Sequence, residues 1–340
     1  MDITIFNAIL SIGGMGLLFG GGLAYASRVF RVEVDPRVEE ILEVLPGANC
    51  GACGKAGCQA FADRLVEGKA KITDCIPGGS TVAHAVARIL GQVVPEVEPM
   101  VAVVHCHGSP DNAIDKFAYQ GVEDCAAAEL ISGGHKACAY GCLGLGTCVR
   151  ACIFDAMEMR ENRLPKVFDD KCTGCTLCVA ACPRGIMDMI PRSAQVYLAC
   201  VSLDKGKAVT NVCKVGCTAC GLCANPKVTP SGAIQMDGNL PVVDYSIPDS
   251  LLVAKYKCPT GSYLDKIPVR PKFSIGTSCV GSGECAKVCP VKNCVSGEPK
   301  KRHVIDPELC IGCGRCAEAC PEKAIYVVGA LGYVRADYVW

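Results

Sequence analysis

The segment 171–183 constrains the fold more than any other part of the chain. It holds four cysteines spaced C-x2-C-x2-C-x3-C and followed by a proline: Cys172, Cys175, Cys178 and Cys182. In bacterial ferredoxins the first three cysteines of such a run ligate one cubane iron–sulfur cluster, and the fourth cysteine ligates the cluster of a second motif. A zinc ribbon is the main alternative, but zinc sites pair two C-x2-C knuckles across a longer gap. The run therefore favours iron–sulfur and predicts a partner motif elsewhere in the chain.

Composition narrows the class of protein further. Of the 340 residues, 28 are cysteines, and their short gaps suit metal ligation better than disulfides, which indicates a reducing compartment. Lysine plus arginine and aspartate plus glutamate each number 34, so no charge excess points to nucleic acid. Domains that bind a structural metal can be small, because the bonds between metal and ligands replace part of the stabilisation by a hydrophobic core. We expect about five parts in the chain.

The N-terminal part of the sequence is apolar. Residues 3–27 carry no charged side chain and are numerous enough to span a bilayer as a helix. Ala24-Tyr25-Ala26 mimics a signal-peptidase site, but no lysine or arginine precedes the apolar run, and the run is too long for a signal peptide. We therefore expect a transmembrane anchor over residues 1–30. Arg28, Arg31 and Arg37 follow the span, so the positive-inside rule places the later domains on the cytoplasmic side of a bacterial inner membrane.

A different cysteine pattern follows within residues 33–92. Four cysteines have the spacing C-x2-C-x4-C-x16-C: Cys50, Cys53, Cys58 and Cys75. They form one self-contained four-thiolate set, so we expect a small helical domain with a single [4Fe–4S] cluster. Pro95 and Pro99 then indicate a linker.

Residues 93–192 contain the partner that the first motif requires. Four cysteines form a stretched half-motif, C-x3-C-x5-C-x3-C: Cys138, Cys142, Cys148 and Cys152. With the run at 172–182 they complete a ferredoxin-like unit for two clusters. Crossed ligation predicts that Cys182 joins Cys138, Cys142 and Cys148. It also predicts that Cys152 joins Cys172, Cys175 and Cys178.

Residues 193–268 read as a degenerate unit of the same kind. The fourth cysteine of its first motif is expected four residues after Cys223, but that position is Lys227. Its second motif retains only Cys258. Under crossed ligation these losses fall on one cluster and leave one complete set, namely Cys217, Cys220, Cys223 and Cys258.

Residues 269–340 form a third unit with one complete set and one incomplete set. The complete set is Cys289, Cys310, Cys313 and Cys316. The incomplete set is Cys279, Cys285 and Cys320, with Ser282 where a fourth thiol is expected. A [3Fe–4S] cluster, a [4Fe–4S] cluster completed by Ser282 or Cys294, and loss of the cluster all remain open.

Four further cysteines belong to none of these motifs: Cys106, Cys125, Cys200 and Cys213. Cys106 and Cys200 each close a short apolar strand that leads into a ferredoxin-like unit. One interpretation is that all four are buried small hydrophobes. The other is that they converge as an additional four-thiolate site. The chain would thus hold about five to seven clusters.

The chain resembles the B subunit of the Rnf ion-translocating ferredoxin:NAD oxidoreductase complex. The likeness is carried by the anchor, the segment from Asn49 to Cys75, the sequence Tyr140–Gly146 and the run at 172–182, and it extends to about residue 260. The C-terminal part looks like an extra ferredoxin-like unit. The resemblance implies a subunit that accepts electrons from soluble ferredoxin and passes them to membrane and NAD-reducing subunits, coupled to export of Na+ or H+.

We therefore expect an α+β protein: an anchor, a helical one-cluster domain and tandem ferredoxin-like units. The residues show no acid–base or nucleophilic constellation and no glycine-rich nucleotide motif after a strand, so flavin and NAD should be bound by other subunits. One alternative is the anchored iron–sulfur subunit of another membrane oxidoreductase, such as a formate dehydrogenase or hydrogenase. A zinc-bearing interaction scaffold is the alternative from another class.

Overall fold

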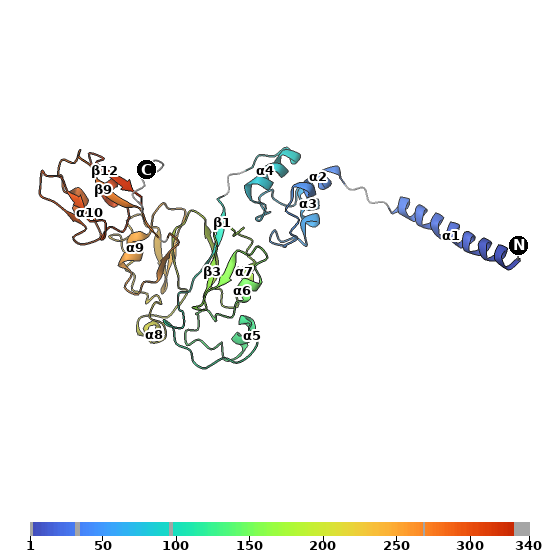
Figure 1. The fold of residues 1–340 in the computed structure, drawn as a ribbon, viewed down its shortest axis with the longest axis horizontal. Coiled ribbons are helices and arrows are strands. Elements are labelled where there is room, and N and C mark those ends of the chain that lie inside the picture. The colour runs from blue at the N-terminus through green and yellow to red at the C-terminus, as the bar shows by residue number, and fades with distance from the viewer. Residues whose placement is uncertain (1–2, 31–34, 95–97, 268, 330–340) are drawn as a thin grey trace. The chain divides into compact units, whose positions relative to one another are not determined.

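The computed structural model describes residues 3–30, 35–94, 98–267 and 269–329 (Figure 1). Arg31, one of the three arginines on which the predicted orientation of the anchor rests, lies outside these residues, as do the last eleven residues of the predicted third unit. The chain divides into two compact units, Met1–Pro95 and Glu96–Trp340.

The first unit begins with one long helix, α1 (Ile3–Val29). The stretch Leu10–Val29 is long and apolar enough to cross a membrane by length and composition, and none of it is buried within the protein. Its large side chains, such as Leu17 and Phe19, are exposed at 81% and 69%. The prediction of an apolar N-terminal helix is confirmed.

Three amphipathic helices complete the first unit: α2 (Pro36–Val44), α3 (Cys58–Val66) and α4 (Gly79–Leu90). Asp35 caps α2 by accepting the backbone N–H of Arg37, and a proline at the first helical position already has the φ that a helix needs. Ile41, Phe61 and Val86, one from each helix, are almost fully buried together. This small core holds α3, whose first residue is a cysteine, against the loop that precedes it.

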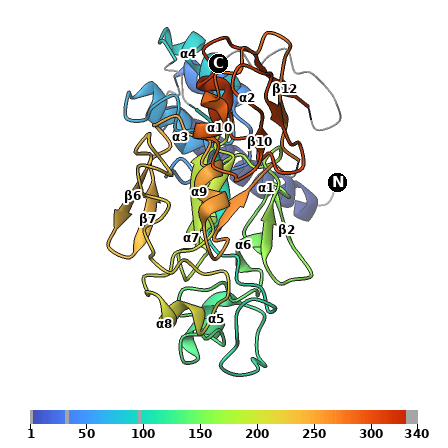
Figure 2. The same cartoon turned by 90° about the vertical axis from the view of Figure 1, so that its left-hand side faces the viewer.

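The strands of the second unit form six two-stranded antiparallel sheets among the described residues (Figure 2). Three of these sheets each join the first and last strand of a segment: β1 (Met100–Val104) with β4 (Met187–Pro191), β5 (Val196–Leu198) with β8 (Tyr263–Asp265), and β9 (Lys272–Ile275) with β12 (Ile325–Val328). Each segment also contains an inner pair: β2 (Met157–Met159) with β3 (Pro165–Val167), β6 (Ile234–Asp237) with β7 (Leu240–Val243), and β10 (Val295–Ser296) with β11 (Val304–Ile305). The same strand pairing therefore occurs three times along the chain.

Short helices lie between these strands. They are α5 (Cys125–Leu130), α6 (Thr147–Arg150), α7 (Leu177–Ala180), α8 (Lys207–Thr210), α9 (Leu252–Lys257), α10 (Glu284–Val288) and α11 (Arg315–Glu318). In both views α5 and α8 lie at the same end of the second unit (Figures 1 and 2). Cysteine side chains form part of each hydrophobic core, for example Cys142 and Cys178 beside Val101. Folding of each segment is thus tied to the environment of its thiols.

Arg184, two residues after Cys182, forms hydrogen bonds with several loops. Its side chain is only 4% exposed and its Nε donates to Glu129 of α5 at 2.6 Å. One terminal nitrogen donates to the carbonyl oxygens of Cys138 and Gly141 at 2.9 and 2.7 Å, and the other donates to that of Gly133. A buried guanidinium with all these acceptors fixes α5 relative to the 138–142 loop.

Removal of residues 1–34 should leave cluster assembly intact, because every cysteine lies beyond α1. We expect this shortened chain to be soluble without detergent and brown, with the same iron and acid-labile sulfide per chain as the full-length protein. Anaerobic purification followed by iron and sulfide analysis checks the prediction. A colourless product would contradict it.

Replacement Arg184→Gln should destabilise the second unit by about 3–5 kcal/mol, because it leaves Glu129 half-buried without its partner and several carbonyl oxygens without a donor. Anaerobic urea unfolding, followed by loss of cluster absorbance, measures the change. Arg37→Gln is the matched control: its ion pair with Asp35 is exposed, so its loss should leave the urea midpoint nearly unchanged.

Candidate metal centres

Five loops of the second unit share one backbone conformation. In each, the first and last cysteines are six residues apart: Cys142–Cys148, Cys172–Cys178, Cys217–Cys223, Cys279–Cys285 and Cys310–Cys316. The residues two and four positions after the first cysteine all have positive φ, and eight of these ten are glycine. Because L-residues pay about 1–2 kcal/mol in this region, the glycines explain why the sequence adopts the loop.

The loop directs backbone N–H groups at sulfur. Cys142 and Cys217 each accept the N–H two residues downstream, and this donor holds the thiol pKa down while burial raises it. After four of the five loops a short helix starts, as α7 does after Thr176, with the last cysteine of the loop as its second residue. Most of the loop cysteines are buried.

The central position of the loop distinguishes the five copies. It is a cysteine in three of them, Cys175, Cys220 and Cys313, but Leu145 and Ser282 occupy it in the other two. The loop at 142–148 therefore begins at Cys142, so Cys138 lies outside it. A fourth thiol must come to this loop from elsewhere.

The structure supplies that thiol from Cys125. Cys125, Cys142, Cys148 and Cys182 line one small cavity of about 20 Å³. Burial raises the pKa of Cys148 to about 11, and the neighbouring Cys125 and Cys182 thiolates raise it next. The grouping differs from the predicted one, in which Cys138 held this place.

The position of Cys125 has a local cause. Asp124 caps α5 by accepting the N–H of Ala127, and it also accepts the hydroxyl of Thr147 at 3.0 Å. The same hydroxyl accepts the N–H of Cys125 at 2.7 Å. Because Thr147 adjoins Cys148, these bonds place the start of α5 beside the loop. The placement of Cys125 beside this loop thus follows from a helix cap at Asp124, 18 residues before Cys142 in sequence.

The other set of this segment is the one that crossed ligation predicts. Cys152, Cys172, Cys175 and Cys178 line one cavity of about 20 Å³. Burial raises the pKa of Cys178 to about 12, and the other cysteines nearby add to the shift. The structure therefore brings together Cys152 and the three cysteines of the intact run.

Two further sets come together as their spacing suggests. In the first unit, Cys75 has its pKa raised by burial and then by the thiolates of Cys58, Cys53 and Cys50. Asn49 accepts the N–H of Cys58 at 2.8 Å and so closes this loop. In the second segment, burial raises the pKa of Cys217, and the thiolates that raise it further belong to Cys223, Cys258 and Cys220.

The third segment holds five thiols at one place and three at another. Cys289, Cys294, Cys310, Cys313 and Cys316 line one cavity. Burial raises the pKa of Cys294 to about 12, followed by the thiolates of Cys289, Cys310 and Cys316. Cys285 instead has Cys279 and Cys320 as its neighbouring thiols, and Ser282 is exposed. The structure therefore places Cys294 beside the complete set and not, as one alternative had it, beside the incomplete one.

The remaining four cysteines also meet. Cys106, Cys138, Cys200 and Cys213 line one cavity of about 30 Å³ between the first and second segments. Three of them belong to no motif that the sequence spacing reveals. All but Cys294 of the 28 cysteines now belong to one of seven groups.

The donor chemistry of these groups fits iron–sulfur clusters. A single zinc ion bound at about 2.3 Å needs sulfur atoms about 3.8 Å apart. Among the described residues, no three His, Cys, Asp or Glu side chains converge closely enough for one metal ion. The thiols instead surround small cavities and accept backbone N–H groups, as cluster ligands do. Cluster binding would release the thiol protons, since the ligand is the thiolate.

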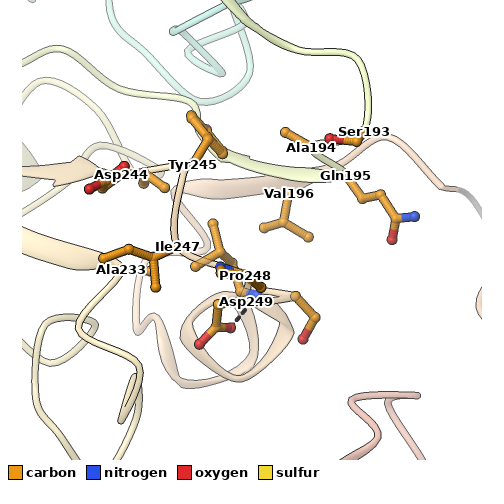
Figure 3. Close-up of a pocket in the computed structure, with 13 residues that line it drawn as sticks. Ser193, Ala194, Gln195, Val196, Ala233, Asp244, Tyr245, Ile247, Pro248 and Asp249 are labelled. Carbon is orange, nitrogen blue, oxygen red and sulfur yellow. Dashed lines mark hydrogen bonds between the residues drawn. The ribbon is translucent and has the colours of Figure 1, made fainter. Parts of the chain in front are cut away.

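A larger cavity, of about 150 Å³, lies elsewhere in the second unit (Figure 3). No cysteine lines it, and its acidic side chains are engaged in turns. Asp249 accepts the N–H of Leu251 and the hydroxyl of Ser231, and Asp244 accepts from Ser246.

Family models match three parts of the chain. A model for an Fe-S cluster matches residues 45–77, and models for a 4Fe-4S binding domain match residues 164–187 and 303–326. These matches cover the cysteine set of the first unit and the two intact ferredoxin-type runs.

Three curated proteins are similar over most of the chain. The B subunit of the Na(+)-translocating ferredoxin:NAD(+) oxidoreductase complex of Acetobacterium woodii is 42% identical over 86% of this chain and 79% of its own length. The B subunit of the Proton-translocating ferredoxin:NAD(+) oxidoreductase complex of Clostridium ljungdahlii is 45% identical over 76% of this chain and 92% of its own. The B subunit of the Ion-translocating oxidoreductase complex of Methanosarcina acetivorans is 41% identical over 72% and 92%.

Among solved structures, the chain matches part of a formate dehydrogenase–heterodisulfide reductase–formylmethanofuran dehydrogenase complex from Methanospirillum hungatei. That match has 17% identity and a TM-score of 0.23, covers 58% of this chain and 78% of that one, and is too weak to carry an argument. The similarity to the three curated proteins is high and spans most of each chain. The chain therefore belongs to the family formed by the B subunits of the ion-translocating ferredoxin:NAD(+) oxidoreductase, or Rnf, complexes.

Proposed function

We propose that this chain accepts low-potential electrons from soluble reduced ferredoxin and passes them to membrane and NAD-reducing subunits of an Rnf complex. The names of the relatives support this, since two are subunits of ferredoxin:NAD(+) oxidoreductases. One of these is Na(+)-translocating and the other Proton-translocating. Because both ions occur at similar identity, we infer export of Na+ or H+ without choosing between them.

The observation that carries the proposal is the series of thiol sets along one chain. Each set suits an iron–sulfur cluster, and such clusters supply one-electron transfer when bound. The residues of the chain hold the clusters, direct N–H groups at their sulfur ligands and exclude water from them, and these are the factors that set cluster potentials. We infer five [4Fe–4S] sites and one site, at Cys279, Cys285 and Cys320, that suits [3Fe–4S].

We further propose a division of the chain by function. Residues 1–30 anchor the protein by a single pass, with the later domains in the cytoplasm, where Arg28 in the last turn of α1 would lie. Residues 33–92 hold one cluster, and residues 93–192, 193–268 and 269–340 are tandem ferredoxin-like units in an α+β arrangement. The repeated strand pairing supports these boundaries.

Mixing experiments with the anaerobically purified full-length chain test the electron donor. We expect stoichiometric reduced ferredoxin to bleach the visible absorbance and to produce the paramagnetic resonance of reduced clusters. NADH alone should do neither, because NAD binding is assigned to other subunits. Reduction by NADH, or failure of ferredoxin to reduce a chain that dithionite reduces, would refute the proposal.

The crossed sets make a spectroscopic prediction. Replacements Cys125→Ala, Cys142→Ala and Cys182→Ala should remove the same reduced-state signal, because all three thiols line one cavity. Cys175→Ala should remove a different signal. Electron paramagnetic resonance of the four reduced variants shows which signal each one has lost. A match between Cys182→Ala and Cys175→Ala would contradict the crossed assignment.

The incomplete set predicts a signal in the oxidised protein. Ser282 offers only a hydroxyl, and Cys294 lies with another set, so a [3Fe–4S] cluster is expected at Cys279, Cys285 and Cys320. Such a cluster is paramagnetic when oxidised, whereas an ordinary [4Fe–4S] cluster is not. Ser282→Cys should abolish the signal and add about one iron per chain. A silent oxidised spectrum in the parent protein would count against the assignment.

A further inference from the structure

One cavity is lined by four cysteines that all lie outside the ranges of the matched family models: Cys106, Cys138, Cys200 and Cys213. They do not come from one motif. Cys106 and Cys138 belong to the first strand-closed segment, and Cys200 and Cys213 to the second. The cavity therefore lies at the junction of the two segments.

The two halves of this junction repeat each other. Cys106 follows β1 after one residue, and Cys200 follows β5 after one residue. Cys138 stands in the sequence Cys-Ala-Tyr-Gly-Cys, and Cys213 in Cys-Lys-Val-Gly-Cys. In both cases the closing cysteine of the pentapeptide is the first cysteine of the six-residue loop described above. Each segment thus contributes an equivalent pair of thiols.

Hydrogen bonding follows the same repeat. The N–H of Cys142 donates to the sulfur of Cys106 at 3.3 Å, and the N–H of Cys217 donates to the sulfur of Cys200 at 3.3 Å. The sulfur of Cys200 also accepts the N–H of Ser202 at 3.5 Å. Amide donors directed at sulfur favour a thiolate. A thiol that serves only as a small hydrophobe has no need of them.

A buried cation accompanies the four thiols. The side chain of Lys136 is 6% exposed, its Nζ has no hydrogen-bond partner among the described residues, and its nearest carboxylate oxygen, on Asp115, is 3.4 Å away. Burial raises the pKa of Cys106, and the positive charge of Lys136 lowers it. A buried ammonium is costly unless negative charge compensates it. Asp115, itself 41% exposed, supplies one such charge at 3.4 Å, and an anionic group held by four thiolates in this cavity would add another.

One glycine, Gly108, lies against two of these thiols. A Cβ at Gly108 would lie 3.4 Å from the sulfur of Cys213, 3.7 Å from that of Cys106 and 3.1 Å from the Cβ of Ala113. The loop that carries Gly108 is tied to the second segment, since Ala113 bridges Cys213 and the N–H of Ile114 donates to Val212 at 3.1 Å. The two segments are therefore held together around the cavity.

We propose that Cys106, Cys138, Cys200 and Cys213 bind one further [4Fe–4S] cluster, shared between the first and second ferredoxin-like segments. The pseudo-symmetric pairs, the N–H donors and the buried Lys136 carry this inference. Its sulfur ligands contact the backbone of Cys142 on one side and of Cys217 on the other. The site thus lies directly between two other thiol sets. The inference concerns ligation and does not depend on which protein donates electrons.

Iron and sulfide counts on the full-length chain, after anaerobic reconstitution, test the site by pairing variants. Cys138→Ala and Cys213→Ala each leave three thiols, which suits [3Fe–4S], and should each lose about one iron, whereas the double variant leaves two thiols and should lose about four. Cys138→Ala combined with Cys125→Ala should lose only about two, one from each site, because these cysteines belong to different sites. Cys294→Ala is the matched control: a buried thiol beside a complete set whose loss should leave the count unchanged.

Several outcomes would overturn the proposal. One is an unchanged iron count in the Cys138→Ala, Cys213→Ala double variant, and another is a loss of about four irons in the Cys125→Ala, Cys138→Ala double variant. Zinc in place of the iron would also overturn it. If a variant fails to fold, as circular dichroism would show, the parent protein still decides: six complete sets with the incomplete set require about 27 irons per chain, whereas five complete sets with the incomplete set require about 23.

Discussion

The contact between backbone N–H groups and buried sulfur underlies the rest of this structure. Buried thiolates are costly, and burial raises the pKa of the thiols in every set. The recurring loop offsets this cost by turning its amides inward, which requires positive φ at two fixed positions. Glycine at eight of those ten positions therefore makes the inward-facing amides possible. The strands and short helices then hold these loops against one another.

Because the loop geometry is set by backbone, its central cysteine can be exchanged. Leu145 occupies that position in one copy, and the thiol is replaced from outside by Cys125, which Thr147 and Asp124 hold beside the loop. Ser282 occupies it in another copy, and the one cysteine left over, Cys294, lies with a different set. The two substitutions look alike in sequence, but the loop with Leu145 gains a fourth thiol and the loop with Ser282 does not. A replacement thiol is available only where a separate segment of the chain reaches the loop.

Much of this arrangement could be predicted from spacing. The apolar N-terminal helix, the one-cluster pattern and the intact runs depend on local sequence, and local sequence determines them. The structure differs from the spacing at Cys138, which spacing groups with Cys142 because four cysteines at 138–152 look like one stretched motif, whereas Cys138 lines the cavity of Cys106, Cys200 and Cys213. The six-residue spacing shared by all five loops, with glycine two residues after Cys142, marks Cys142 as the true first position. The role of Cys125 could not be read this way, since it rests on a tertiary hydrogen bond.

The junction of the first two segments shows why repetition matters for a protein of this family. Two ferredoxin-like segments placed side by side would leave their clusters separated by protein. A pair of thiols at the entrance of each segment, Cys106 with Cys138 and Cys200 with Cys213, lets the segments share a ligand site where they meet. The amides of Cys142 and Cys217 then link that site to the first ligand on either side. A cluster ligated by both segments would fix the distance between them. Electrons could then pass from one segment to the other through that cluster.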